Sequence, residues 1–380
     1  MRVLFVATEM AARAFLHEPI RGVARDHAVA LATPCADPEL LRALGTDGPA
    51  FCVPIARPMR PRQDLKALVA LVRLLRRERF DAIHSVTPKA GLLAMLAGRI
   101  AGVPVRTHSF TGQVWATRAG FSRTLLKGVD RLLHRLTTFS LVDSPSQRDF
   151  LIREGVIAAE RSAVLADGSI SGVDPERFRP DSAARARIRA ELGIDAAAPV
   201  LLFLGRLTGD KGLQDLVPAF AAVRRAHPEL RLLLVGPDEE ALGETLPDLA
   251  GDQADGVTLI GHTDAPEAYM AAADLFCLPS YREGFGSVLI EAGAAGIPAI
   301  ASRICGVVDA VADGETGYLH PPRDQAEIER LLRLLVEDEG LRRRLGLAAM
   351  ARARARFSAA RLSQAFRDYY ARAFRESRSS

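Results

Sequence analysis

The sequence predicts two α/β domains in tandem, each a parallel sheet with helices on both faces. Three observations support this prediction: 380 residues exceed what one hydrophobic core usually holds, 48% of the residues are apolar, and short apolar runs alternate with helical patterns. Strands covered by helices on both faces consist of nearly continuous apolar residues, as these runs do. We therefore expect two doubly wound sheets, whose strand carboxyl ends face a deep cleft.

The elements follow one another in the order that such sheets require. In the first half, apolar residues recur at helical spacing in residues 65–79, 89–100 and 123–136. The predicted strands of the first half are residues 3–7, 27–33, 80–86, 103–109, 139–145 and 162–168. Those of the second half are residues 199–207, 230–237, 257–261, 274–280, 298–304 and 316–322.

Turn signals and a charged helical segment separate the two series of strands. They place the boundary within residues 175–198, which predicts a first domain of residues 1–180 and a second of residues 181–355. Residues 356–380 are predicted to form a helix that packs on another surface. Its apolar anchors are Phe357, Leu362, Phe366, Tyr369, Tyr370 and Phe374.

The composition disfavours several classes of protein. The N-terminal apolar run of about seven residues is followed by Glu9, which is typical of a first strand and not of a signal peptide. No window holds the roughly 18 uncharged apolar residues of a membrane span, so a cytoplasmic protein is expected. The four cysteines lie far apart, without histidines at ligand spacing, so neither a disulfide framework nor a metal site is indicated.

The net charge of +4 conceals an asymmetry between the halves. Residues 1–180 carry 26 Lys and Arg against 17 Asp and Glu, whereas the remainder carries 24 against 29. Such a basic half suits anionic lipid headgroups or phosphorylated acceptors, although solvated arginine faces are also common. Aromatic residues do not interleave the basic ones, so no nucleic acid is expected as a partner.

The basic excess of the first half is concentrated in two predicted helices. Residues 57–79 hold eight basic and two acidic residues. The apolar face predicted for this helix consists of Leu65, Leu68, Val69, Val72 and Leu75. The second helix places four cations at intervals of four residues, and therefore in one stripe: Arg123, Lys127, Arg131 and Arg135.

Two cations follow the first strand of the second domain. In LFLGRLTGDKGLQDLVPAF the strand ends at Gly205, Arg206 and Lys211 lie in the loop, and Gly212 opens the next helix. Fixed cations at the mouth of a strand–loop–helix unit suit a phosphate or pyrophosphate, although loop cations are often only surface charges. Neither a P-loop nor a GxGxxG fingerprint is present.

The segment PSYREGFGSVLIEAGAAGIP strengthens the prediction of an anion site. Gly284 and Gly286 allow the backbone to approach a ligand closely, and Ser287 has the features of a helix N-cap. The helix ends near Gly296, a candidate C-cap. Its N-terminus, which carries a partial positive charge, would lie beside the two cations of the preceding loop, so an anion is expected there.

Two acids, Glu283 and Glu291, flank this turn. Glu283 precedes the helix, where its carboxylate can accept hydrogen bonds from sugar hydroxyls. Glu291 lies about one turn inside, and helical side chains lean toward the N-terminus, so its carboxylate can bind two hydroxyls of a ribose. The alternative for Glu291 is a partly exposed acid that is solvated by water.

Three segments together resemble the C-terminal half of family 4 retaining glycosyltransferases of the GT-B fold. They are GRLTGDKG, PSYREGFGSVLIEAGAAGIPAIAS with its Glu-x7-Glu spacing, and GVVDAVADGETGYLHPPRD. SGVDPERFRP resembles that family's interdomain segment, and residues 103–157 are similar to bacterial polysaccharide and lipid-linked oligosaccharide members. The resemblance spans nearly the whole chain. It implies a nucleotide-sugar donor bound by the second domain without metal or cofactor, an acceptor against the first domain, and a final helix that crosses back to the first domain.

The resemblance also implies roles for the matching residues. Arg206 and Lys211 would hold the donor diphosphate and stabilise the charge of the leaving group, while Glu291 binds ribose and Glu283 contacts the transferred sugar. The turn before the helix would complete the donor site, with backbone N–H groups from Phe285, Gly286, Ser287 and Val288 beside Gly284.

The first domain has fewer specific signals. His108 is at or near the position where some relatives have a catalytic histidine close to the transferred sugar, although a lone histidine beside a strand is more often structural. His84 and Lys89 are expected in a loop that faces the cleft and meets acceptor or phosphate. The loop ATEMAARAFLHEP lacks the paired glycines of many relatives, which leaves Glu9 and Arg13 as its acceptor-side candidates.

The expected function is that of a retaining, metal-independent glycosyltransferase. It would move a hexose or N-acetylhexosamine from a nucleotide diphosphate sugar, with UDP favoured, to a polyprenyl-diphosphate-linked or polysaccharide acceptor in cell-surface glycan synthesis. The basic first domain favours the inner face of the cytoplasmic membrane as a partner. The alternatives are a glycosyltransferase for a soluble natural product or metabolite, a UDP-sugar epimerase, and a non-catalytic sugar-nucleotide binding protein.

Overall fold

The computed structural model describes residues 1–55 and 60–379, and the chain forms two compact units. Unit 1 consists of Met1–Gly172 and the segment that begins at Ala359, and unit 2 is Val173–Ser358. Each unit contains one of the two predicted parallel sheets, so the predicted fold class is confirmed. Arg57, in the basic segment 57–79, lies outside the described residues.

Unit 1 is built on a seven-stranded sheet of order β3-β2-β1-β4-β5-β6-β7. All of its neighbouring strands run parallel. The strands are β1 (Arg2–Val6), β2 (Ala28–Thr33), β3 (Ala50–Cys52), β4 (Ala82–Val86), β5 (Val105–Phe110), β6 (Phe139–Val142) and β7 (Ser162–Ala163). The helices are α1 (Glu9–Phe15), α2 (His17–Ala24), α3 (Pro38–Ala43), α4 (Pro61–Glu78), α5 (Pro88–Ala101), α6 (Gly120–Leu136), α7 (Pro145–Arg153) and α16 (Ala359–Ser379), with 3-10 turns η1 (Val114–Thr117) and η2 (Ala159–Arg161).

Unit 2 is built on a six-stranded sheet of order β10-β9-β8-β11-β12-β13, again parallel. The strands are β8 (Val200–Leu204), β9 (Arg231–Val235), β10 (Val257–Ile260), β11 (Leu275–Leu278), β12 (Ala299–Ser302) and β13 (Gly317–His320). The helices are α8 (Ser182–Glu191), α9 (Leu213–Arg224), α10 (Leu246–Ala250), α11 (Pro266–Ala272), α12 (Ser287–Ala294), α13 (Val307–Ala310), α14 (Gln325–Glu337) and α15 (Glu339–Arg356), with 3-10 turns η3 (Gly209–Lys211), η4 (Leu242–Glu244) and η5 (Gly251–Gly256).

Residues 173–180, which the sequence assigned to the first domain, belong to unit 2 because their contacts lie in that unit. The N–H of Val173 donates to the carbonyl of Phe357 at 2.8 Å, and Arg177 forms an ion pair with Glu267 at 2.9 Å. Phe357, which the sequence assigned to the last helix, lies in the core of unit 2 with its ring 5.3 Å from that of Phe285. The anchor role predicted for Phe357 was therefore wrong.

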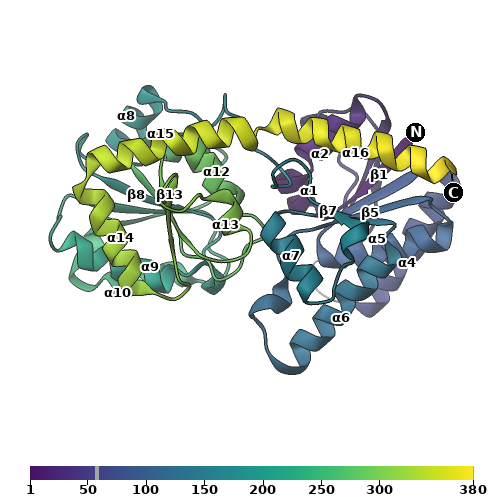
Figure 1. Ribbon diagram of the computed structural model, residues 1–380, viewed down its shortest axis with the longest axis horizontal. Helices are drawn as coiled ribbons and strands as arrows, with labels where there is room; N and C mark the ends of the chain where they lie inside the picture. Colours follow the sequence, from purple (N-terminus) through teal and green to yellow (C-terminus); the bar gives the residue numbers. More distant parts are fainter. Residues whose placement is uncertain (56–59, 380) are drawn as a thin grey trace. The chain divides into compact units, whose positions relative to one another are not determined.

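Helix α16 packs in unit 1 beside α2, as Figure 1 shows. Its remaining predicted anchors are all buried in a core that it shares with β1, α1 and α2. They are Leu362, Phe366, Tyr369, Tyr370 and Phe374. The last helix therefore completes the core of the unit in which the chain begins.

Three local predictions were wrong. Strand β3 was missed because it has only three residues at the edge of its sheet. The segment ATEMAARAFLHEP is not a loop, since α1 and α2 occupy most of it. Of the stripe predicted for helix α4, Leu75 is buried, whereas Leu65 is 62% exposed; the other buried residues of the helix are Ala67, Leu71 and Leu74.

Both sheets have a topological switch point at the strand from which the chain winds outward in two directions. In unit 1 it lies between β1 and β4, and in unit 2 between β8 and β11. Ligands of open α/β sheets bind at the carboxyl ends of the strands at such points. The loops that follow β8 and β11 are the two that the sequence selected for the donor.

Candidate donor and acceptor sites

In unit 2, the loops after β8 and β11 are in direct contact. Gly212 is the N-cap of α9 and has φ +71°, a conformation that residues with a Cβ rarely adopt. A Cβ at this position would lie 2.1 Å from the carbonyl oxygen of Pro279, so glycine is also required by the close approach of the second loop. The sequence marked Gly212 as the start of a helix, and the structure adds this second reason for it.

Hydrogen bonds join the two loops. The N–H of Tyr281 donates to the carbonyl of Asp210 at 2.8 Å, and the guanidinium of Arg282 donates to the carboxylate of Asp210 at 2.6 Å. The hydroxyl of Tyr281 donates to Asp215, in the first turn of α9, at 2.6 Å. The two loops therefore form one structural unit at the switch point of the sheet.

Lys211 and Glu283, both predicted donor residues, are ion-paired across this junction. The Nζ of Lys211 lies 2.5 Å from Oε1 of Glu283, and each side chain is 14% exposed. The same carboxylate oxygen accepts a hydrogen bond from Ser280 Oγ at 2.7 Å. The structure thus brings together two residues that the sequence treated as separate contacts to phosphate and sugar.

Arg206, the second predicted cation, pairs with an acid that sequence reasoning missed. Its Nη1 lies 2.7 Å from Oε2 of Glu239, in the loop after β9, and the neighbouring Glu240 accepts the N–H of Gly209 at 2.8 Å. The only available signal was the run of acids PDEE after a predicted strand. Both predicted phosphate ligands are therefore held by carboxylates in this structure.

The turn before α12 presents backbone groups to the same edge of the sheet. The helix begins at Ser287, and its N-cap is Gly286 with φ +77°, so the prediction of Ser287 as N-cap was wrong. Gly284 and Phe285 precede it, and the Phe285 side chain is buried. The backbone N–H groups of the first helical turn, which includes Val288, carry the positive end of the helix dipole, and the N–H of Leu289 donates to the carbonyl of Gly286 at 2.8 Å.

Glu291 lies one turn inside α12 and is partly buried. Burial raises the pKa of its carboxyl to about 7, an effect that Arg177 opposes and Glu267 reinforces. Its carboxylate makes no hydrogen bond or ion pair with the residues that the structure describes. Both sequence-based interpretations, a ribose ligand and a solvated acid, stay predictions.

In unit 1, His84 and His108 lie inside the sheet. The Nδ1 and Nε2 atoms of His84 lie 2.8 Å from the Tyr370 hydroxyl and from Ser109 Oγ, respectively. His108 Nδ1 lies 2.9 Å from Ser85 Oγ. Burial lowers the pKa of each imidazole to about 3, so both rings are neutral at physiological pH.

The loop position predicted for His84 was wrong, because the residue belongs to β4, is fully buried, and connects the sheet to α16. His108 lies within β5 and is 1% exposed, so in this structure its ring has almost no surface for a sugar. A Cβ on Gly91 would lie 2.5 Å from the His108 ring, which shows how closely α5 covers it. Its catalytic role stays a prediction.

Lys89, Glu9 and Arg13 lie at the carboxyl edge of the unit 1 sheet. Lys89 is in the first turn of α5, and its Nζ lies 2.6 Å from Oδ1 of Asp64 on α4. Arg13 pairs with Glu9 at 3.2 Å and with Asp37 at 3.6 Å. Sequence reasoning missed Asp37 and Asp64, which no motif marks.

The backbone conformation of Thr87 is a second observation that favours a functional site at this edge of the sheet. This residue, between β4 and α5, has φ +76°. Positive φ is a true outlier for a β-branched side chain, and such strain clusters at functional sites. It lies at the switch point of unit 1, two residues before Lys89.

In residues 1–55 and 60–379, no group of three or more His, Cys, Asp or Glu side chains is arranged to hold a metal ion. No helix in the same residues combines the length and the apolar composition that crossing a bilayer would demand.

Two family descriptions match the chain. "Glycosyl transferase 4-like domain" matches residues 12–168, within unit 1, and "Glycosyl transferases group 1" matches residues 184–352, within unit 2. The capsular polysaccharide biosynthesis glycosyltransferase CapM of Staphylococcus aureus is 29% identical over 311 residues, 81% of this chain and 81% of CapM. A D-inositol 3-phosphate glycosyltransferase of Nocardioides sp. is 36% identical over 326 residues, 79% of this chain and 69% of that protein.

Solved structures share the fold. HepE of Anabaena, in complex with UDP and glucose, has a TM-score of 0.82 at 22% identity over 98% of this chain and 99% of its own. Sucrose-phosphate synthase of Thermosynechococcus elongatus has a TM-score of 0.83 at 22% identity over 99% of this chain and 100% of its own. With its two parallel-sheet units, the chain has the GT-B fold and belongs to the glycosyltransferase family that the group 1 and 4-like descriptions define.

Proposed function

We propose that the protein is a retaining, metal-independent glycosyltransferase of family 4. It moves a hexose or N-acetylhexosamine from a nucleotide diphosphate sugar, with UDP favoured, to a polyprenyl-diphosphate-linked or polysaccharide acceptor in cell-surface glycan synthesis. The observation that carries the proposal is the junction of the β8 and β11 loops, which places Arg206, Lys211 and the N-terminus of α12 at one switch point. The name of CapM, a capsular polysaccharide biosynthesis glycosyltransferase, supports a role in glycan synthesis, and the complex of HepE with UDP and glucose supports UDP as the donor nucleotide.

The proposed donor site works by electrostatics. As the bond between sugar and diphosphate breaks, negative charge grows on the leaving phosphate, and preorganised cations and helix N–H groups stabilise it. Before the donor binds, Glu239 and Glu283 hold the side chains of Arg206 and Lys211 in place. When the donor binds, its diphosphate would replace these carboxylates as the partner of the two cations. Once released from Lys211, the Glu283 carboxylate would accept hydrogen bonds from hydroxyls of the transferred sugar. The acceptor would attack from the face that the diphosphate leaves, which retains the configuration of the donor.

Arg206→Ala tests the donor assignment. A charge-assisted hydrogen bond is worth roughly 1.5 to 3 kcal/mol, so the transfer rate should fall at least about tenfold. Arg330→Ala is the matched control, because Arg330 is an exposed arginine of α14 that forms an ion pair with Glu327 on the same helix. Thermal-shift screening of sugar nucleotides with the wild type identifies the donor for this assay. Unchanged transfer by Arg206→Ala would contradict the site.

The configuration and metal requirement are tested on the same reaction. The anomeric signal of the product in an NMR spectrum should show the α configuration of an α-linked donor, and a β product would contradict retention. EDTA should leave the rate unchanged because two cations and a helix N-terminus take the place of a divalent ion. Strong inhibition that Mg²⁺ or Mn²⁺ reverses would contradict metal independence.

Membrane association is proposed from the outer helical face of unit 1, defined by Leu65 and Val69 of α4 with Phe121 and Leu125 of α6. Phe121 is 81% exposed and Leu125 52% exposed. Helix α5 lies between α4 and α6 in the layer that Figure 1 shows. Large apolar side chains that project from a basic surface suit the interface of an anionic bilayer.

The predicted cationic stripe of α6 contributes less to this face than the sequence suggested. Arg123 and Lys127 both pair with Glu154, and Arg131 donates to the carbonyls of Glu154 and Gly155. Attraction to lipid therefore depends more on the exposed apolar residues and on other cations of unit 1 than on that stripe.

Vesicle co-sedimentation tests the membrane proposal. The wild type should bind vesicles of anionic lipid at low salt, and Phe121→Ser with Leu125→Ser should weaken binding severalfold because the inserted apolar area is lost. Leu347→Ser is the control, since Leu347 is 54% exposed on α15 in unit 2. Absence of wild-type binding, or equal loss in the control, would contradict the proposal.

A second candidate function is transfer to a small phosphorylated metabolite. The relative from Nocardioides, 36% identical, is named a D-inositol 3-phosphate glycosyltransferase. With the donor identified, a transfer assay with D-inositol 3-phosphate decides between the two acceptor classes. Efficient transfer to this soluble acceptor, without any effect of lipid vesicles, would favour the second candidate.

A further inference from the structure

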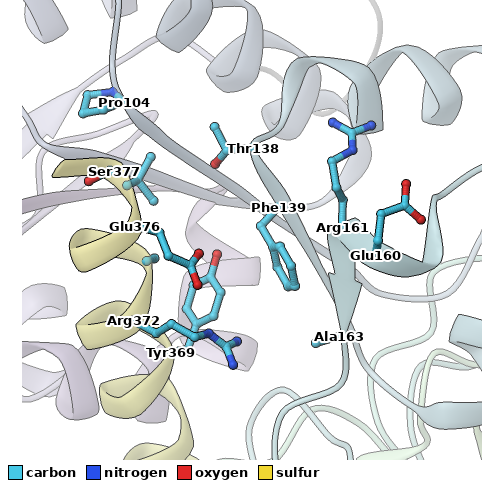
Figure 2. A pocket seen from close by; sticks show the side chains of 12 residues that line it. Pro104, Thr138, Phe139, Glu160, Arg161, Ala163, Tyr369, Arg372, Glu376 and Ser377 are labelled. Carbon is cyan, nitrogen blue, oxygen red and sulfur yellow. The ribbon is translucent and has the colours of Figure 1, made fainter. Parts of the chain in front are cut away.

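Unit 1 contains a groove that none of the predicted site residues lines. Its volume is about 860 Å³, which is within the range of small-molecule sites. Its walls are the residues at the start of β5 and β6, the η2 turn before β7, and the last turns of α16 (Figure 2). We call it the α16 groove.

The α16 groove lies at the opposite edge of the sheet from the proposed acceptor side. Val105 and Phe139, which line it, are the first residues of β5 and β6. Lys89, by contrast, follows the carboxyl end of β4. Because these strands are parallel, their amino ends and carboxyl ends lie at opposite edges, so the groove is separate from the acceptor side of the same unit.

One face of α16 is directed into the groove. The helix residues that line it recur at intervals of three and four, and therefore form one stripe: Tyr369, Arg372, Ala373, Glu376 and Ser377. The neighbouring stripe, with Phe366, Tyr370 and Phe374, supplies the buried anchors. Arg372 and Glu376 are exposed, so the packing of the helix does not require them.

The charged groups that line the groove are balanced in number. Two guanidinium groups, Arg161 and Arg372, and two carboxylates, Glu160 and Glu376, line it. Within the described residues, the side chains of Arg372 and Glu160 form no hydrogen bond or ion pair, and the guanidinium of Arg161 donates to the Thr137 carbonyl at 3.4 Å. Since the charges cancel, the groove favours neither an anion nor a cation.

This combination matches a neutral molecule rich in hydroxyl groups. A guanidinium only donates hydrogen bonds and a carboxylate only accepts them, whereas a hydroxyl does both, so adjacent hydroxyls can accept a hydrogen bond from Arg372 and donate one to Glu376. The partly buried Phe139 ring, which Figure 2 shows opposite α16, offers an apolar face. A pyranose has such a face on one side of its ring and hydroxyls at its rim.

We propose that the α16 groove is a second saccharide-binding site. It would hold a neutral segment of the acceptor glycan away from the end that reacts, and in this respect it rests on the proposed function. Binding of the remote segment would raise the affinity for long acceptors without a new contact at the reacting end, through effective concentration.

Saturation-transfer NMR on the full chain tests the site with neutral trisaccharides, maltotriose and triacetylchitotriose, in the presence of saturating UDP. We expect at least one of them to bind at millimolar concentration. The double variant Arg372→Ala with Glu376→Ala should raise its Kd at least about tenfold. Arg375→Ala is the control, since Arg375 is exposed on the same helix and does not line the groove. Inorganic phosphate, added as an anion probe, should not compete.

Three results would overturn the inference: no binding of either trisaccharide, unchanged binding by the double variant, or competition by phosphate.

A transfer assay separates failure of this inference from failure of the proposed function. Arg372→Ala should raise KM for long glycan acceptors severalfold and leave kcat and the KM for a monosaccharide acceptor unchanged. If saccharides bind the groove but no donor is turned over, the proposed function fails alone. If transfer occurs without binding at the groove, the inference fails alone.

Discussion

Replacement of Lys211 gives the sharpest test of the proposed donor site, because this residue has one role in the structure and a second, separable role in the proposed reaction. Its Nζ neutralises Glu283 across the loop junction at 2.5 Å, and in the proposed reaction it binds the diphosphate. Lys211→Ala removes both. Adding Glu283→Gln removes the unpaired carboxylate and keeps its shape. Because Glu283 is also the proposed sugar contact, Glu283→Gln alone measures that contribution, and the difference between it and the double variant gives the phosphate contact.

The two roles predict different magnitudes. Each side chain of the pair is 14% exposed, so the pair is intermediate between a surface ion pair, worth up to about 1 kcal/mol, and a buried one, whose disruption costs about 3 to 5 kcal/mol. Lys211→Ala should therefore lower the free energy of unfolding by about 2 kcal/mol. Loss of the diphosphate contact should lower kcat/KM by a factor of about 10 to 150, from roughly 1.5 to 3 kcal/mol.

Urea denaturation and donor turnover measure the two effects on the same proteins. The double variant should recover most of the lost stability, while its kcat/KM stays low. Arg187→Ala is the control for loss of an ion pair, since Arg187 pairs with Glu191 on the exposed face of α8. If the double variant regains wild-type turnover, Lys211 acts only by neutralising Glu283, and its assignment to the diphosphate is refuted.

Two further predictions concern stability. Burial raises the pKa of Glu291 to about 7 from about 4.3 in an unfolded chain, so the folded state binds the extra proton and the free energy of unfolding falls as pH rises between these values. In urea titrations between pH 4.5 and 7, the free energy of unfolding of Glu291→Gln should fall by up to about 3 kcal/mol less than that of the wild type. An unchanged pH dependence would contradict the raised pKa of Glu291. Gly212→Ala should lower the free energy of unfolding by at least about 2 kcal/mol, because the new Cβ would clash with the Pro279 carbonyl. Gly193 has a similar φ but open space around it, so Gly193→Ala should cost about 1 kcal/mol. Equal losses of stability in the two variants would contradict the steric argument.

Much of the fold could be predicted from the sequence because buried parallel strands are locally apolar. All twelve predicted strands correspond to strands of the structure, whereas β3 has only three residues and carries too little pattern to identify. The stripe of α4 was misassigned for a related reason: apolar residues lie on more than one side of this helix, and its packing against α5 and the sheet decides which side is buried.

For the donor site, the sequence by itself determined the residue types and their local order: cations after β8, and a glycine turn with two acids before and within α12. Only the tertiary structure decided which of them meet. Lys211 and Glu283 are 72 residues apart, and Arg206 and Glu239 are 33 apart. Pairing over such separations depends on the order of strands in the sheet, which brings β11 beside β8 and leaves no trace in local spacing. The contact of His84 with the hydroxyl of Tyr370, 286 residues away on α16, likewise depends on tertiary packing and not on local spacing.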